Sequence, residues 1–188
     1  MGLDSVELVM SFEEYFSVTV PDQEIEQVCT IRDMVQVVSA HKGIDNDGNS
    51  LQEDMLTRIL NYLESDRDAF VFQAFHPSDK AFWEGIMNRV GLSIPMPSLQ
   101  VSEERERGIR RIFKRILGPP GYDWRTITTE RLAEVVCFAN YKELVDPAYL
   151  KSKYDIYIAV SGITGDLMGI DYYEILPDKS FAGDFHIN

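Results

Sequence analysis

Apolar residues recur at helical spacing along most of the chain. In residues 5–16, Leu8, Phe12 and Phe16 fall every four positions, which places them on one face of a helix. The same spacing of apolar residues predicts a helix opened by Thr30 and further helices over 51–63, 78–90, 102–117, 129–145 and 153–168. No segment sustains the strict alternation of apolar and polar residues that a half-buried strand shows. We therefore predict an all-α protein.

Several of these predicted helices carry start and stop signals. Thr30-Ile31-Arg32-Asp33 has the form of a capping box, with Asp33 in place of the usual Glu. Ser78 and Thr129 are expected to cap the helices that they open, and Gly91 is expected to end the helix over 78–90. Each boundary is thus predicted from local chemistry alone.

The charge of the chain is concentrated at its two ends. The net charge is −13. Residues 1–49 hold 10 acids and 2 bases, and residues 151–188 hold 6 acids and 3 bases, whereas residues 50–150 hold 15 acids and 13 bases. Such acidity disfavours nucleic acid and anionic membranes as partners and favours basic protein surfaces. No apolar stretch approaches the roughly 18 residues of a membrane span, and no signal peptide is recognisable, so we expect a cytoplasmic protein.

Two segments at opposite ends of the chain resemble one protein family. The segment from Val6 to Phe16, followed by Val20-Pro21-Asp22, resembles the second helix of acyl carrier proteins and the loop after it. The helix opened by Thr30 resembles the last helix of that family. Residues 157–171 and 175–185 resemble its first helix and long loop. The resemblance thus implies a carrier whose first helix stands at the C-terminus.

The resemblance also implies a domain organisation. Residues 1–44 and 151–188 would form a circularly permuted acyl-carrier-like bundle, and residues 50–150 would form a helical domain that resembles no family we recognise. Neither end can bury its apolar faces without the other. Either the chain closes on itself, or two chains exchange their ends in a domain-swapped homodimer.

The resemblance leaves the prosthetic group in question. Acyl carrier proteins hold their cargo on 4'-phosphopantetheine, attached to a serine at the start of the second helix, where free N–H groups favour the phosphate. The family position lies four residues before Val6, where this chain has Gly2. Ser5 is the attachment candidate, three positions later. Alternatively, Asp4 or Ser5 only caps the helix and the fold carries no arm. The position of Gly2 favours this second interpretation and predicts that Ser5 is not modified.

The predicted first helix carries an acidic face. Glu7, Met10 and Glu14 share one side of it, with Glu13 beside them, and this matches the surface that carriers present to enzymes. The simplest alternative is a solvated helix exterior. The resemblance implies basic-surfaced acyl-handling enzymes or a phosphopantetheinyl transferase as partners. We therefore expect an acyl-carrier-like protein, or alternatively a degenerate carrier fold that acts as an interaction or regulatory module.

Other reactive residues give no catalytic pattern. Cys29 and Cys137 each lie in an apolar helical pattern and are expected to be buried free thiols. His41, His76 and His186 are far apart and lack the spacing of metal ligands. We predict no metal site, no catalytic residues and no enzymatic activity.

A basic cluster in the predicted helix over 102–117 has two explanations. Arg110, Arg111, Lys114 and Arg115 follow acidic residues, an order that complements the dipole of a helix. Alternatively, the cluster docks the acidic carrier helix, within one chain or between two.

Overall fold

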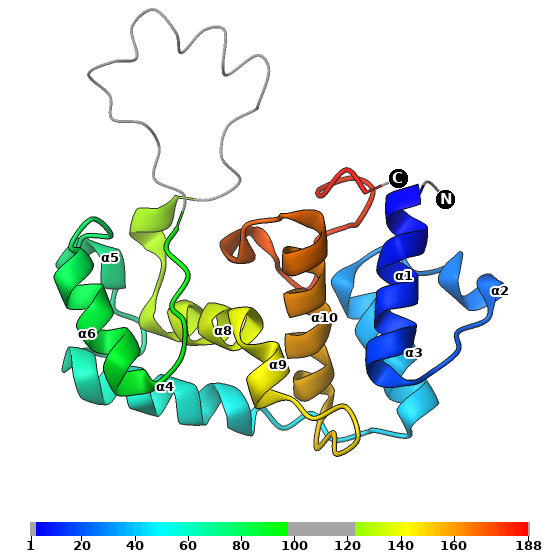
Figure 1. Cartoon of the computed structure of the whole chain (residues 1–188), viewed down its shortest axis with the longest axis horizontal. Helices are drawn as coiled ribbons and strands as arrows, with labels where there is room; N and C mark the ends of the chain where they lie inside the picture. The colour runs from blue at the N-terminus through cyan, green and yellow to red at the C-terminus, as the bar shows by residue number, and fades with distance from the viewer. Residues whose placement is uncertain (1–2, 98–122, 188) are drawn as a thin grey trace, which may run out of the picture.

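The computed structural model describes residues 3–97 and 123–187, and within these ranges the protein is built of helices without β-strands (Figure 1). The all-α prediction is confirmed. The predicted helix over 102–117 and its basic cluster lie outside the described residues. The elements in chain order are α1 (Leu3–Phe16), α2 (Asp22–Ile25), α3 (Ile31–Lys42), α4 (Ser50–Leu63), α5 (Val71–Ala74), α6 (Lys80–Val90), η2 (Trp124–Thr126), α8 (Thr129–Ala139), α9 (Tyr141–Leu144), α10 (Lys153–Met168) and η3 (Tyr172–Glu174).

Helix α10 is the central element of the fold. It begins with a capping box in which Ser152 accepts a hydrogen bond from the Asp155 N–H and the Asp155 side chain accepts from the Ser152 N–H. Residues from Asp155 to Gly165 are all buried, so the helix is covered on every side. It packs against α1, α3 and α8, and Figure 1 shows it between these helices. A helix that is apolar all round requires such a position.

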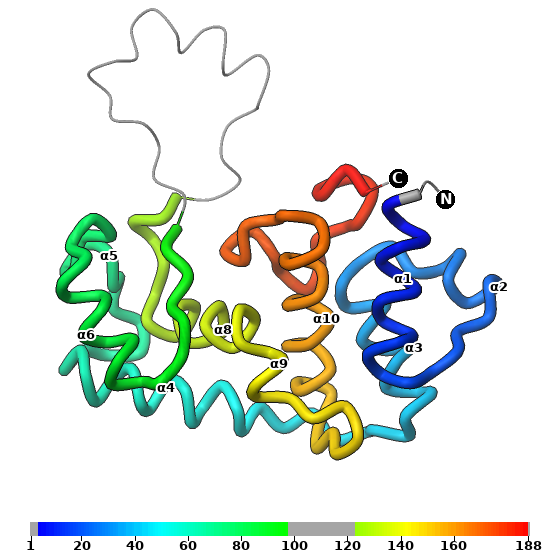
Figure 2. The backbone as a smooth tube through the Cα atoms, viewed as in Figure 1, coloured from blue at the N-terminus to red at the C-terminus, as the bar shows by residue number. Residues whose placement is uncertain are grey.

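The two ends of the chain meet in the bundle around α10. The predicted face of α1 is buried, with Leu8, Phe12 and Phe16 exposing 3%, 1% and 0% of their surface. Helix α1 packs on α10, as the sequence predicts, and its first turn lies beside the C-terminal loop (Figure 2).

A second group of helices holds the aromatic residues of the middle region. Helix α4 packs against both α6 and α8 there, and Phe72 of α5 and Trp83 of α6 are buried with their rings 5.2 Å apart. Helix α8 also packs on α10, and the buried residues of both groups form one continuous hydrophobic core. The division into two domains remains a prediction.

The cap of α3 is as predicted, while two others shift by one residue. Thr30 and Asp33 form the capping box. Helix α6 is capped by Asp79 rather than Ser78, because the Ser78 hydroxyl is bonded to His76. Helix α8 is capped by Thr128, whereas the Thr129 hydroxyl donates to the Ala69 carbonyl oxygen. Gly91 ends α6 with a φ of 78°.

The predicted helix over 129–145 is interrupted at Asn140. The side-chain amide of Asn140 donates to the carbonyl oxygens of Val136 and Ser93, and its oxygen accepts from the Ser93 N–H. The residue leaves the helical conformation, with a φ of −119° and a ψ of 24°. Helix α9 therefore starts as a separate turn after Asn140, which is held by its bonds to the distant residue Ser93.

Candidate functional site

Ser5, the attachment candidate, lies in the first turn of α1. The helix already includes Leu3 and Asp4, so neither Asp4 nor Ser5 is the capping residue, and that expectation is wrong. Ser5 is half-buried. The first four N–H groups of any helix lack partners within it, and an anion near Ser5 would meet this end of α1.

An apolar groove of about 750 Å³ runs beside Ser5. It lies between α1, the segment of α2 and α3, and the C-terminal loop. Its apolar lining comes mainly from Leu8, Val9, Phe12, Val28, Met34 and Phe181. Cys29 and Ser180 also line it. The structure thus brings together Ser5 and Phe181, which belong to the two predicted halves of the carrier-like unit.

Backbone pairing holds the C-terminal loop against the start of α3. The Phe181 N–H donates to the Cys29 carbonyl oxygen at 2.9 Å, and the Arg32 N–H donates to the Pro177 carbonyl oxygen at 2.8 Å. Arg32 also forms an ion pair with Asp178, which lowers the pKa of that carboxyl through hydrogen bonding. One wall of the groove is therefore made by the far end of the chain.

Cys29 departs from its prediction as a buried thiol. It is exposed, in the turn between α2 and α3, whereas Cys137 is buried as expected and both are free thiols. Its backbone is engaged on both sides, because its N–H donates to Asp33 and its carbonyl oxygen accepts from Phe181. The chain therefore fixes the backbone of Cys29 and leaves its side chain at the groove.

The acidic face of α1 is partly as predicted. Glu7, Met10 and Glu14 are exposed, Met10 to 62%. Glu13 is not simply part of this exposed face. Its carboxylate accepts a hydrogen bond from the Val20 N–H at 2.7 Å and closes the turn after α1. Lys42 donates to the carbonyl oxygen of Phe16 at 3.0 Å and further stabilises this helix end.

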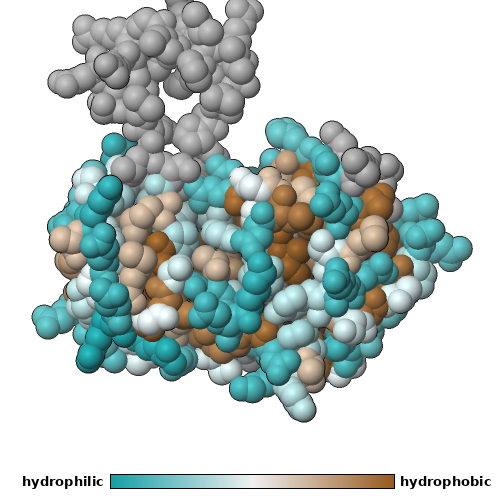
Figure 3. All heavy atoms as spheres, in the orientation of Figure 1, coloured by the Kyte–Doolittle hydropathy of each residue, from teal (hydrophilic) through white to brown (hydrophobic). Residues whose placement is uncertain are grey.

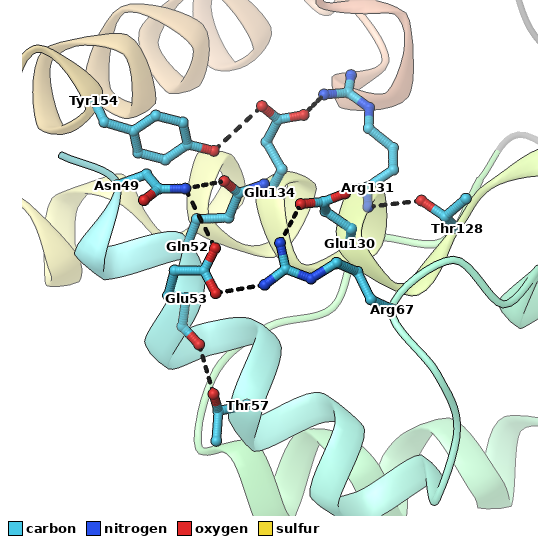
Figure 4. A network of polar contacts seen from close by, with 10 residues as sticks. All are labelled: Asn49, Gln52, Glu53, Thr57, Arg67, Thr128, Glu130, Arg131, Glu134 and Tyr154. Atoms are coloured by element: carbon cyan, nitrogen blue, oxygen red, sulfur yellow. Dashed lines mark hydrogen bonds and ion pairs between the residues drawn. The ribbon is translucent and has the colours of Figure 1, made fainter. Parts of the chain in front are cut away.

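A polar network that the sequence did not predict links the middle region to α10 (Figure 4). Arg131 on α8 pairs with Glu134, which accepts a hydrogen bond from Tyr154 on α10. Burial and the neighbouring Glu134 carboxylate raise the pKa of the Tyr154 hydroxyl well above its ordinary value. Only the helical spacing of Arg131 and Glu134 could have suggested the pair.

The second part of this network ties α8 to α4. Arg67 forms ion pairs with Glu53 and Glu130, at 2.5 and 2.9 Å (Figure 4). These side chains are well exposed, so the pairs contribute little stability each. They show no arrangement of nucleophile and base that would indicate catalysis.

The described residues contain neither a cluster that could bind a metal nor a helix that could span a membrane. Within residues 3–97 and 123–187, no cluster of three or more His, Cys, Asp or Glu side chains could hold a metal ion. His41 instead contacts Glu24 at 2.9 Å. None of the helices in these ranges is both long and apolar enough to cross a bilayer.

Comparison with known proteins finds similarity to acyl carrier proteins over part of the chain. The acyl carrier protein of Helicobacter hepaticus is 50% identical over 41 residues, which are 22% of this chain and 54% of that protein. The acyl carrier protein of Zymomonas mobilis is 48% identical over 41 residues, 22% of this chain and 53% of that protein. The chain therefore spans about half the length of the curated relatives it matches. No family model and no solved structure matches it. Part of the chain is thus acyl-carrier-like.

Proposed function

We propose that this protein is an acyl-carrier-like protein that holds an acyl group on 4'-phosphopantetheine at Ser5. The observation that carries the proposal is that Ser5, in the first turn of α1, lines the same apolar groove as Phe181 from the other end of the chain. The similarity to acyl carrier proteins supports the same assignment.

The residues around Ser5 fit such an arm. Ser5 has a hydroxyl group, the kind of group that forms a phosphodiester bond, and the first N–H groups of α1 favour a phosphate. When bound, the arm supplies a terminal thiol that holds an acyl group as a thioester. The groove beside Ser5 would shelter the hydrocarbon from water, at about 0.8 kcal/mol per buried methylene.

The proposal includes the circular permutation. Helices α1, α3 and α10 pack as one bundle, and the C-terminal loop pairs with residues 29–32 at the start of α3. This arrangement is what a carrier would have if its first helix and long loop stood at the other end of its sequence. The proposal takes the form in which the chain closes on itself.

The exposed face of α1 would present the carrier to its enzymes. Glu7 and Glu14 are exposed on either side of Met10. Such a surface complements a basic patch with an apolar centre, as expected for acyl-handling enzymes or a phosphopantetheinyl transferase.

The test is intact-mass measurement after incubation with a broad-specificity phosphopantetheinyl transferase and coenzyme A. Contrary to the expectation drawn from Gly2, the proposal predicts a gain of about 340 Da that disappears in Ser5→Ala. Ser180→Ala is the matched control, because Ser180 also lines the groove, and it should keep the gain. A chain that stays unmodified, or a gain that survives Ser5→Ala, would contradict the proposal.

The second candidate is a carrier fold without an arm. It is favoured by Gly2, which occupies the family position of the serine. In that case the protein would act through the face of α1 alone, as an interaction or regulatory module. An unmodified chain that still binds a basic partner through Glu7 and Glu14 would support this alternative.

A further inference from the structure

A second groove, of about 460 Å³, lies between α1, α9 and α10. We call it the interhelical groove; it is lined chiefly by Ser11, Glu14, Tyr141, Lys142, Ile163 and Leu167. It shares Glu14 with the acidic face of α1, so the two surfaces are continuous. One wall comes from α9, which belongs to the middle region of the chain rather than to the carrier-like ends.

The walls of this groove are held in place by close contacts. Tyr141 lies against Gly162, where an added Cβ atom would be 2.2 Å from Cδ1 of the ring. Tyr15 on α1 contacts the Tyr141 ring edge-on at 5.5 Å and donates its hydroxyl to the Val145 carbonyl oxygen at 2.8 Å. The groove is therefore preformed, which reduces the entropic cost of binding.

Apolar surface extends into the groove from α10. Leu167 lies one turn after Ile163 on α10, yet it is 37% exposed while Ile163 exposes 5%. The apolar stripe of α10 thus continues one turn beyond the core, and Figure 3 shows hydrophobic surface over this helix between hydrophilic side chains. Opposite, Ser11 is small and its hydroxyl is bonded to the Glu7 carbonyl oxygen at 2.9 Å, which leaves room for a side chain from outside.

The charges of the groove leave one acid without a counter-charge. Lys142 pairs with Asp166 at 2.9 Å, and Tyr172 also donates its hydroxyl to Asp166. Glu14 is exposed, and no other described residue engages its carboxylate. A ligand that fits both the Glu14 carboxylate and the apolar surface at Leu167 carries a positive charge next to an apolar group.

We propose that the interhelical groove binds an amphipathic segment of a partner protein, with a Lys or Arg at Glu14 and a Leu- or Met-like side chain between Ser11 and Leu167. The inference rests on the proposed function, because it names the chemistry of the docking partner. The inference goes beyond the proposed function because one wall of the groove comes from α9, where Tyr141 would contact the partner. The middle region then selects partners that a carrier lacking it would not distinguish.

The probe is a fluorescein-labelled helical peptide of leucine and lysine, with a leucine–glutamate peptide of equal length as its control. Binding is measured by fluorescence anisotropy on the full chain. We expect binding of the basic peptide only, weakened about tenfold or more by Glu14→Lys and by the groove-filling Ser11→Trp. Glu84→Lys, an exposed charge reversal on α6, should change the affinity less than about twofold.

Two results would overturn the inference. One is Ser11→Trp binding as tightly as the unaltered chain, which would place the peptide elsewhere. The other is an equal loss in Glu84→Lys and Glu14→Lys, which would indicate attraction to overall charge alone. Ser5→Ala should bind the peptide normally. A failure of Ser5 modification is thereby distinguishable from a failure of the groove.

Discussion

Arg131 donates a hydrogen bond from Nη2 to the carbonyl oxygen of Ile175 at 2.6 Å, and the same nitrogen lies 3.1 and 3.3 Å from the carbonyl oxygens of Tyr172 and Tyr173. Its guanidinium also lies 5.5 Å from the centre of the Phe138 ring. The loop that it holds continues to Phe181, in the groove beside Ser5. The middle region is thus bonded to the segment that shapes the candidate site.

Replacing Arg131 tests this connection. Arg131→Met removes all of these bonds and leaves Glu134 without its counter-charge, and both side chains are only 16% exposed. We expect a loss of about 3 kcal/mol in the free energy of unfolding, measured by urea denaturation. Arg58→Met, which removes an exposed ion pair with Asp54, should cost less than about 1 kcal/mol. Equal losses in the two variants would show that Arg131 is not a structural link.

Phe12 tests the bundle formed by the two ends of the chain. Because it is 1% exposed, Phe12→Ala should leave a cavity and lower the free energy of unfolding by ~3–5 kcal/mol. Met10→Ala on the exposed side of the same helix should change it by less than about 0.5 kcal/mol. A loss below about 1 kcal/mol in Phe12→Ala would mean that α1 does not contribute to the core.

The capping box of α3 predicts a dependence on pH. Burial acts to raise the pKa of Asp33, but hydrogen bonds from Thr30 and the Cys29 and Thr30 N–H groups outweigh it and lower the pKa below 3.8. A lowered folded pKa means that the stabilisation is present above 3.8 and is lost as the pH falls through the folded value.

Asp33→Asn should therefore be less stable than the unaltered chain by about 1 kcal/mol near neutral pH. The difference should shrink as the pH is lowered below 3.8, because the Asp33 carboxylate then becomes protonated. Urea denaturation of both proteins, near neutral pH and below pH 3.8, measures this difference in the free energy of unfolding. A constant difference across this range would show that the charge of Asp33 does not stabilise the cap.

The two thiols should react differently. Burial, with smaller contributions from nearby acids, raises the pKa of Cys137 to about 12, whereas Cys29 is exposed. Iodoacetamide at about pH 8 should add one carbamidomethyl group to the folded chain and two after unfolding in urea. Mass spectrometry should find no addition to folded Cys29→Ser. Labelling of folded Cys137 would show that the core around α8 opens readily.

Local patterns predicted most of the helices, because caps and apolar stripes act over a few residues. Thr30 and Asp33 form their capping box, and the apolar stripe of α1 is buried, as periodicity alone requires. The packing of α1 on α10 was also predictable, since each presents an apolar face that its own half of the chain cannot cover.

Tertiary contacts decided the features that form the grooves. Asn140 interrupts a helix because Ser93 is its partner, and Arg131 is held by carbonyl groups some 40 residues away. Leu167 is exposed and Cys29 lies at a groove, although both belong to apolar patterns. Periodicity shows which side of a helix is apolar, but whether another element covers a given turn depends on residues distant in sequence. The grooves exist where that covering is incomplete, and only the folded chain determines those places.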